Sequence, residues 1–313
     1  MLKFTLRRIA TGLILLFVVC SLSFYLLSLG SANVARAILG VNATQADIIK
    51  FNILHGLDKP FITQYWNWLS HAVRFDFGDP WGSPYPVFAT VKAHVTVTLV
   101  LVGIATIFSG LVSVLLGVAA ALKKGWVDRI VQLLGLIGFA VPNFLIALGI
   151  ILLFAVKFHI FQAVGYTPAT QGFVLFLKTA TLPIFALFFT SLASVTQQVR
   201  GSVKDAIEND YVRTLRTRGL SFNRVIYKHV LRNAIGPALT VLGLQFIGML
   251  GGAVIIENIF AIPGIGPLTV QSVSQHDVPT VMGIVTMTAI LVVGVNLILD
   301  LISAALNPKV RLS

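Results

Sequence analysis

The residues of this sequence that are best placed to do chemistry lie in one segment, residues 200–232. Acidic side chains come first in it, at Asp205, Glu208 and Asp210, and a group of arginines follows. This order of charge matches the macrodipole of a helix over 205–218, which favours acids at its start and cations at its end. Charged groups arranged in this way offer non-covalent grip on a partner and not catalysis.

A glycine and a serine predict how this segment continues. Gly219 supplies the left-handed residue that ends a helix, and Ser221 is placed to cap a second helix over Phe222–Arg232. Apolar residues of the second helix recur at helical spacing and share one face: Phe222, Val225, Ile226 and Val230. The sequence therefore predicts a helix–glycine–helix element whose apolar ridge, flanked by arginines, docks a partner.

Catalytic, nucleotide-binding and metal-binding patterns are absent from the sequence. It contains no Gly-x-x-x-x-Gly-Lys-[Ser/Thr] phosphate loop, no His-Glu-x-x-His and no Gly-x-Ser-x-Gly. The histidines are scattered without metal-ligand spacing, at His55, His71, His94, His159, His229 and His276. Cys20 is the single cysteine, so no internal disulfide can form. We therefore expect a non-catalytic chain with no metal site and no cofactor of its own.

The composition requires a bilayer around the protein. Hydrophobic residues make up 57% of the chain and charged residues 11%, about half the charged share of a globular domain. Uncharged segments long enough to cross the hydrocarbon core as helices are Ile9–Leu29, Val95–Leu122, Ile130–Val156, Thr179–Val199, Asn233–Ile256 and Val278–Leu299. Continuous apolar runs of this length exclude tilted barrel strands. The predicted fold is an all-α integral membrane protein with about six transmembrane helices.

The first of these segments also has features of a signal peptide. It follows Lys3, Arg7 and Arg8 and precedes the small residues Ser31-Ala32-Asn33. Its 21 uncharged residues exceed the apolar region of a signal peptide, so the pattern favours an uncleaved anchor helix.

The distribution of basic residues predicts how the helices are oriented. Sixteen of the 23 Lys and Arg residues fall in the N-terminus, in 123–129, in 200–232 and in the C-terminal tail. Cytoplasmic loops carry such an excess of cations, so both termini are predicted to face the cytoplasm. The net charge of +12 then follows from topology, and we expect no nucleic-acid partner.

Three regions follow from this topology. Residues 1–94 hold the anchor helix and a long extracytoplasmic loop, 95–305 hold five transmembrane helices with the basic loop, and 306–313 form a cytoplasmic tail. In the outer loop, the aromatic-rich stretch 61–69 predicts a short helix at the membrane interface, which serves either as an anchor or as a docking surface for an external partner. Residues 79–86 are rich in proline and glycine and predict an irregular loop.

Glycines and prolines inside the predicted spans indicate a packed helix bundle. Gly103, Gly110 and Gly117 recur every seven residues, and Gly248 and Gly252 form a Gly-x-x-x-Gly step. Both patterns let helices approach closely. Helix kinks or local openings are expected at three prolines: Pro142, Pro183 and Pro237.

The predicted spans contain no Lys, Arg, Asp or Glu. Proton- and ion-coupled transporters keep such a residue at depth, where it carries the coupling ion. The absence therefore argues against an ion-coupled secondary transporter, and energy for transport would have to come from another chain. Asp300, at the end of the last span, is either a solvated helix end or a relay.

The basic segment resembles the EAA coupling loop of ABC-importer permeases, and more narrowly that of the dipeptide/oligopeptide permease family. The resemblance is carried by Asp210-Tyr211-Val212-Arg213-Thr214-Leu215-Arg216-Thr217-Arg218-Gly219-Leu220-Ser221 and continues through Val225 to the stretch His229–Pro237. Arg213-Thr214-Leu215 stand where the general pattern has Glu-Ala-Ala, and Leu231-Arg232 where it has Leu-Pro; these departures are typical of the peptide branch. Three further stretches match the same branch: Gly56–Pro60, Glu257–Gly266 and Asn307–Arg311.

The resemblance implies a type I importer permease in a bacterial inner membrane. Such a subunit would pair with a second homologous permease, bind two ATP-binding subunits that hold ATP and Mg, and receive peptides from an extracytoplasmic substrate-binding protein. The residues implied to couple transport to the ATPase subunits are Asp210, Tyr211, Arg213, Thr214, Leu215, Arg216, Arg218, Gly219, Leu220 and Ser221.

Two further groups of residues are expected to serve transport. The uncharged fifth span, with Gln245, Gly248 and Gly252, would line part of the path, although Gln245 could equally make an interhelical hydrogen bond. The residues expected to form an outer gate, to contact the binding protein or to make only a structural turn are Glu257, Phe260, Pro263 and Gly264.

Other functions stay as alternatives. Within the same branch the cargo could be nickel, glutathione or an antimicrobial peptide, because cargo choice rests largely with the binding protein. A secondary transporter or a channel would need a buried charge or a selectivity motif, and a membrane enzyme would need a catalytic cluster near the interface. The sequence shows neither.

Overall fold

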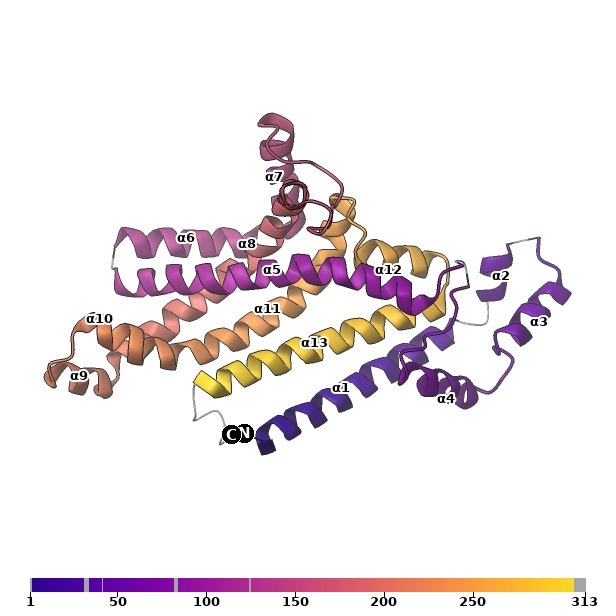
Figure 1. The fold of residues 1–313 in the computed structure, drawn as a ribbon, viewed down its shortest axis with the longest axis horizontal. Helices are drawn as coiled ribbons and strands as arrows, with labels where there is room; N and C mark the ends of the chain where they lie inside the picture. Colours follow the sequence, from indigo (N-terminus) through magenta and orange to yellow (C-terminus); the bar gives the residue numbers. More distant parts are fainter. Residues whose placement is uncertain (1, 31–33, 41, 82–83, 124, 307–313) are drawn as a thin grey trace. The chain divides into compact units, whose positions relative to one another are not determined.

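The computed structural model describes residues 2–30, 34–40, 42–81, 84–123 and 125–306. Over these residues the protein is helical and contains no strand. The helices long and apolar enough to cross a bilayer are α1 (Leu2–Leu29), α5 (Val87–Leu122), α8 (Phe173–Glu208), α11 (Leu231–Ile259) and α13 (Val278–Leu306) (Figure 1). The predicted all-α membrane architecture is confirmed, and a sixth span depends on how one bent helix pair is counted.

The predicted span Ile130–Val156 is wrong as a single helix. In its place are α6 (Trp126–Ala140) and α7 (Asn143–Ile150), which continues as a π-helix over Ile151–Lys157. The two parts are bent by 106° at the break between them. Val141 is extended, as a residue before proline prefers to be, and Pro142 has no N–H to donate to the preceding turn. The proline therefore ends α6 and turns the chain.

The other helices run past the limits of the uncharged segments. α8 reaches Glu208, and α11 reaches Ile259, so Glu257 lies on the same helix as the predicted fifth span, one residue beyond its expected end. Pro183 and Pro237 lie inside continuous helices. Neither shows a break like the one at Pro142, since the residues on both sides of each proline are helical.

Two compact units are formed by the contacts within the chain. The first comprises residues 1–8, 98–262 and 294–313, and the second comprises 9–97 and 263–293. The division at residues 94 and 305 predicted from topology concerns the sides of the membrane and stays a prediction. The tail motif Asn307–Arg311 and the small residues 31–33 lie outside the described residues.

In the first unit, α8 packs against α6, α7 and α11. Glycines allow two of its neighbours to come close. A Cβ atom on Gly117 of α5 would lie 2.7 Å from Cβ of Val199, and one on Gly138 of α6 would lie 2.5 Å from Cβ of Ala193. Helices in a bilayer gain little from burying apolar surface, so this close van der Waals packing is what holds them together.

The remaining glycines singled out from the sequence differ in their surroundings. A Cβ atom on Gly110 would lie 3.1 Å from Cδ2 of Leu242 in α11, which is the close approach predicted there. Gly103 and Gly248 have no atom within 4 Å of that position among the described residues, and Gly252 has only Asn143. The predicted close approach is therefore confirmed at Gly110 and Gly117 and wrong, within this chain, at Gly103 and Gly248.

The second unit contains most of α1, the first turns of α5, the first part of α13 and four short helices. The short helices are α2 (Val34–Leu39), α3 (Gln45–Leu54), α4 (Phe61–Ala72) and α12 (Ile265–Ser274). Its core joins Phe77 and the first turns of α5, at Val87 and Val91, to Ile265 of α12 and Ile284 of α13. Residues distant in the sequence thereby fix the unit.

Helix α4 confirms the short helix predicted over 61–69. Its aromatic side packs on α1, because the Phe24 ring lies 5.6 Å from that of Tyr65 and 5.4 Å from that of Trp68. The Tyr65 and Ser21 hydroxyl groups are 2.6 Å apart. Trp66, on the other side, is exposed. Anchoring and docking both stay predictions for this helix, whose inner side is held by α1.

The stretch 79–86 is irregular over its described residues, as predicted. The backbone N–H of Trp81 donates to Oδ1 of the buried Asp277 at 3.2 Å, and Thr280 Oγ1 donates to Oδ2 at 2.6 Å. One carboxylate thus ties this loop to the start of α13.

The glycine contacts give a matched test of packing on α5. Gly117→Ala places a methyl group against Val199 and 3.0 Å from the Thr196 carbonyl oxygen, whereas Gly103→Ala enters open space. We expect Gly117→Ala to destabilise the protein by about 1–3 kcal/mol and Gly103→Ala to have no such effect. Thermal unfolding of the two variants in the same detergent measures the difference. Equal melting temperatures would contradict the close α5–α8 packing.

Candidate functional site

The segment between α8 and α11 differs from the two predicted helices. α8 ends at Glu208, Asn209 is extended, and a separate helix α9 (Asp210–Thr217) follows. The Asn209 side-chain amide donates to the Asp205 carbonyl at 3.0 Å. This hydrogen bond satisfies a carbonyl group that has no partner within the helix, and it thereby stabilises the C-terminal end of α8. The helix predicted over 205–218 is therefore two helices.

The predicted glycine stop is confirmed at the other end of α9. Gly219 has φ +83°, in the left-handed region, and its N–H donates to the Arg216 carbonyl at 3.0 Å. Ser221 precedes α10 (Phe222–Val225), which passes through a π-helical turn at Ile226–Val230 directly into α11. The predicted second helix is thus the beginning of α11 and not an independent element.

The apolar side of this segment is buried in the first unit. Val212 of α9 joins Val225, Ile226 and Val230 in a cluster with residues of α8 such as Val203, and all of these are at most 3% exposed. Tyr211, Leu215 and Leu220 pack against the same cluster. The predicted apolar docking ridge is therefore wrong for Val225, Ile226 and Val230, because their own chain already covers them.

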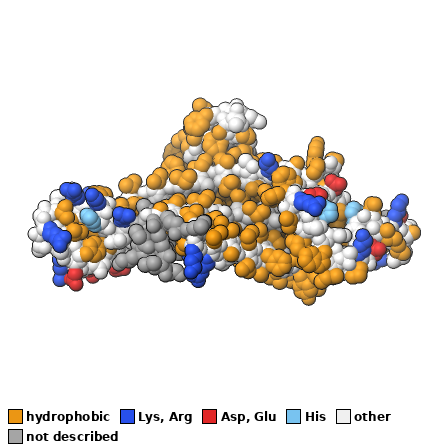
Figure 2. Space-filling view, turned by 60° about the horizontal axis from the view of Figure 1, so that its bottom comes forward, with side chains coloured by type: hydrophobic (Ala, Val, Ile, Leu, Met, Phe, Trp, Pro, Cys, Tyr) orange, Lys and Arg blue, Asp and Glu red, His pale blue; other side chains and the backbone are white. Residues whose placement is uncertain are grey.

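The outer side of α9 is polar and positively charged. Arg213 and Asp210 are 79% and 97% exposed and lie 3.9 Å apart, and the Arg216 guanidinium lies 5.5 Å from the Phe222 ring centre. Figure 2 shows several Lys and Arg side chains at the surface around α9 and α10. The exposed members of the predicted set are Asp210, Arg213, Thr214, Arg216, Arg218, Gly219 and Ser221. They present a small charged surface on a base fixed by apolar packing.

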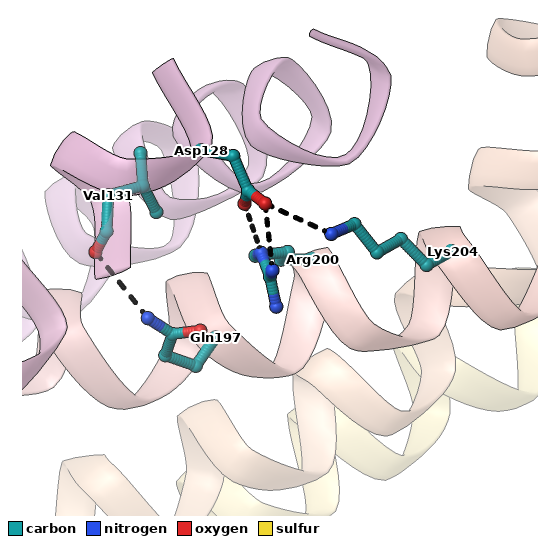
Figure 3. Close-up of polar contacts among 5 residues, drawn as sticks. All are labelled: Asp128, Val131, Gln197, Arg200 and Lys204. Carbon is teal, nitrogen blue, oxygen red and sulfur yellow. Dashed lines mark hydrogen bonds and ion pairs between the residues drawn. The ribbon is translucent and has the colours of Figure 1, made fainter. Parts of the chain in front are cut away.

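Sequence reasoning missed an ion cluster between α6 and α8 (Figure 3). Asp128, in the first turn of α6, accepts hydrogen bonds from Arg200 Nε and, at 2.9 Å, from a terminal guanidinium nitrogen. Lys204 Nζ lies 3.2 Å from the same carboxylate. The only local signal is that Asp128 is an acid within the otherwise basic stretch 123–129.

A hydrogen bond joins α7 to α8, and α11 lies close to the same residue of α7. Thr190 of α8 donates a hydrogen bond to the side-chain oxygen of Asn143, the first residue of α7. The Asn143 side-chain nitrogen lies 3.3 Å from the position that a Cβ atom would take on Gly252. The three helices therefore meet at Asn143, next to one of the residues expected to line a path.

The expected path residues lie along one side of α11. Gln245 and Gly252 are partly buried and Gly248 is exposed. Their spacing of three and four residues puts them on one face, and this face is only partly covered by the described chain. Their role in a path stays a prediction.

The residues expected at an outer gate or binding-protein contact fall into two groups. Glu257 and Phe260 are fully buried in the first unit. Thr98 Oγ1 donates to Glu257 at 2.5 Å, and the Phe260 carbonyl accepts from Gly165 N–H at 2.8 Å. A contact with an external protein therefore does not fit these two residues in this conformation. Pro263 is exposed and Gly264 is buried.

Comparisons with known proteins agree with the resemblance seen in the sequence. Residues 113–312 match the family described as binding-protein-dependent transport system inner membrane component, and residues 1–108 match its N-terminal counterpart. A putative peptide transport system permease protein of Brucella abortus (strain 2308) is 32% identical over 98% of both chains. The oligopeptide transport system permease protein AppB of Bacillus subtilis (strain 168) is 32% identical over 99% of this chain and 100% of its own.

Two further comparisons extend this set. The glutathione transport system permease protein GsiC of Salmonella typhi is 32% identical over 99% of both chains. Among solved structures, an inward-facing MetNI methionine ABC transporter matches with a TM-score of 0.56 and 16% identity, over 72% of this chain and 100% of that one. At this identity the structural match shows a shared fold.

Gly219 provides a test of the turn after α9. The left-handed conformation destabilises a residue that has a Cβ atom by about 1–2 kcal/mol, and the effect is smaller for asparagine than for other residues. We expect Gly219→Val to raise amide hydrogen exchange across residues 210–225 by about 5- to 30-fold, and the matched variant Gly219→Asn to stay close to the wild type. Equal exchange in the two variants would contradict the role of this conformation in holding α9.

Proposed function

Because this chain belongs to the family of binding-protein-dependent transport system inner membrane components, we propose that it is a permease subunit that forms half of a peptide translocation path and receives its energy through α9. ATP hydrolysis takes place on partner subunits, which bind ATP and Mg. This chain supplies no catalytic group.

The observation that carries this proposal is the build of α9. The helix is eight residues long, its inner side packs on the ends of α8 and α11, and its outer side exposes charged residues. A force applied to the outer side therefore reaches two long helices through close packing. Such a connection transmits a rigid-body displacement, which a flexible loop would absorb.

The proposed assembly follows from this placement and from the family. α9 and both termini face the cytoplasm, where one of two ATP-binding subunits docks on the charged surface. A second homologous permease completes the path in the bacterial inner membrane, and an extracytoplasmic substrate-binding protein delivers the cargo. The partly open face of α11, with Gln245 and Gly248, faces the path or the second permease.

Peptides are the proposed cargo. Relatives named for peptide and oligopeptide transport match the chain over nearly its whole length, and so does one named for glutathione, which is itself a small peptide. The predicted fifth span, residues 233–256, carries no charged residue, which suits cargo with varied side chains because strong specific contacts would slow release. We expect short peptides, supplied with the cognate binding protein, to drive ATP-dependent uptake into vesicles that contain the complex. Uptake of nickel in place of peptides would contradict this cargo.

Charge reversal on α9 tests where the ATPase subunits bind. Arg213 is exposed on α9, and Arg129 is an exposed cation on the same predicted side but outside this helix. We expect Arg213→Glu to weaken the binding of ATPase subunits about tenfold, equivalent to about 1.4 kcal/mol, with a matching loss of peptide uptake. Arg129→Glu should bind as the wild type does, when both variants are measured on the purified permease pair.

If Arg213→Glu binds the ATPase subunits as tightly as Arg129→Glu, and stimulation of ATP hydrolysis by loaded binding protein is unchanged, then α9 is not the docking helix.

A further inference from the structure

We propose that Asp128 is a positioning residue that acts as a splint on α8: it binds residues on both sides of Gly201 and so keeps α8 from bending there. A displacement of α9 is then passed on to the rest of α8 and to α6. The proposal rests on the function proposed above for α9. It concerns α6, α8 and α9, which all belong to the first unit.

Gly201 is a weak point in the stretch of α8 that leads to α9. Glycine in the middle of a helix lowers its stability because it has the greatest backbone freedom to lose. No atom lies within 4 Å of a Cβ position at Gly201 among the described residues, and its φ angle is not positive. Neither close packing nor a left-handed conformation therefore requires a glycine here.

The Asp128 carboxylate bridges this weak point. It binds Arg200 on one side of Gly201 with two hydrogen bonds, and Lys204 on the other side at 3.2 Å (Figure 3). The Asp128 and Arg200 side chains are only 17% and 20% exposed. A two-pronged arginine–carboxylate pair is directional as well as strong, and shielding from water preserves it better than an open surface pair.

Helix α6, which carries Asp128, is itself packed closely against α8. Farther along α6, the Val131 carbonyl accepts a hydrogen bond from Gln197 of α8 at 3.4 Å. A Cβ atom on Gly135 would lie 2.5 Å from the Gln197 side-chain nitrogen, and Gly138 meets Ala193 equally closely. α6 therefore lies against α8 over several turns and cannot yield without separating from it.

The far end of α6 leads to the predicted path. After the break at Pro142, Asn143 is bonded to Thr190 of α8 and lies beside Gly252. The α6–α8 pair is thus fixed at the Asp128 cluster and again at Asn143. With the splint intact, motion of α9 reaches Asn143 through two joined helices. Without it, α8 bends at Gly201, so that the end of α8 moves with α9 while the part of α8 before Gly201, which is packed on α6, stays behind.

The test separates ATP hydrolysis from transport. Asp128→Asn removes the charge and keeps the shape, and Asp205→Asn is the matched control, an exposed carboxylate on α8 with no ion pair among the described residues. Both are measured in the full complex with loaded binding protein. We expect Asp128→Asn to retain at least about half of the stimulated ATP hydrolysis while peptide transported per ATP falls at least about threefold. Asp205→Asn and Asp128→Glu should keep the wild-type ratio.

A second-site change makes the test specific for bending. Gly201→Ala stiffens α8 without a steric conflict, so the double variant Asp128→Asn/Gly201→Ala should recover most of the transport per ATP. If Asp128→Asn keeps the wild-type ratio, or if Gly201→Ala gives no recovery, the proposal is overturned. If Asp128→Asn does not assemble, Lys204→Met, which leaves the Asp128–Arg200 pair in place, should lower the ratio by a smaller factor; an unchanged ratio overturns the proposal.

The outcome also distinguishes this inference from the function on which it rests. Loss of coupling in Arg213→Glu together with a wild-type ratio in Asp128→Asn overturns the splint alone. Wild-type behaviour of Arg213→Glu overturns the proposed docking at α9, and the splint with it.

Discussion

Close packing along α8 is the constraint on which the rest of the first unit depends. In a bilayer, helices gain little from covering apolar side chains, since lipid does so equally well, and their association relies on van der Waals contact and on scattered polar bonds. α8 meets this requirement with its neighbours through Gly117 and Gly138, where a single methyl group would collide with Val199 or Ala193. The helix is therefore held over most of its length before it reaches α9.

In the proposed function, this arrangement would let a small charged helix act on a membrane bundle. The apolar residues of α9 are committed to the core that contains the ends of α8 and α11, so its free surface is almost entirely polar. A polar contact surface can bind and release a partner in each cycle, while the buried side keeps its position. In the coupling proposed above, the ion cluster at Asp128 supports the part of α8 that Gly201 weakens, and Asn143, bonded to Thr190 of α8, lies beside Gly252 of α11.

The bilayer made much of this fold predictable, because an apolar solvent requires long uncharged helices whatever their neighbours. The glycine stop at Gly219 was also predictable, since it is local. Periodicity showed that Val225, Ile226 and Val230 share a face, but not that the same chain covers that face. Pro142 breaks a helix while Pro183 and Pro237 do not, a difference that the residue type does not reveal. Asp128 meets Arg200 across 72 residues, and no local pattern records such a pair.

The central claim is that ATPase subunits engage the protein at α9. A photo-crosslinking amino acid at the exposed position Thr214, with the same group at Trp66 of α4 as the comparison, tests it in the assembled complex. Mass spectrometry of the products identifies the chain that each position touches. We expect position 214 to crosslink to an ATP-binding subunit and position 66 not to do so. Crosslinks to the ATP-binding subunits that avoid position 214 would contradict it.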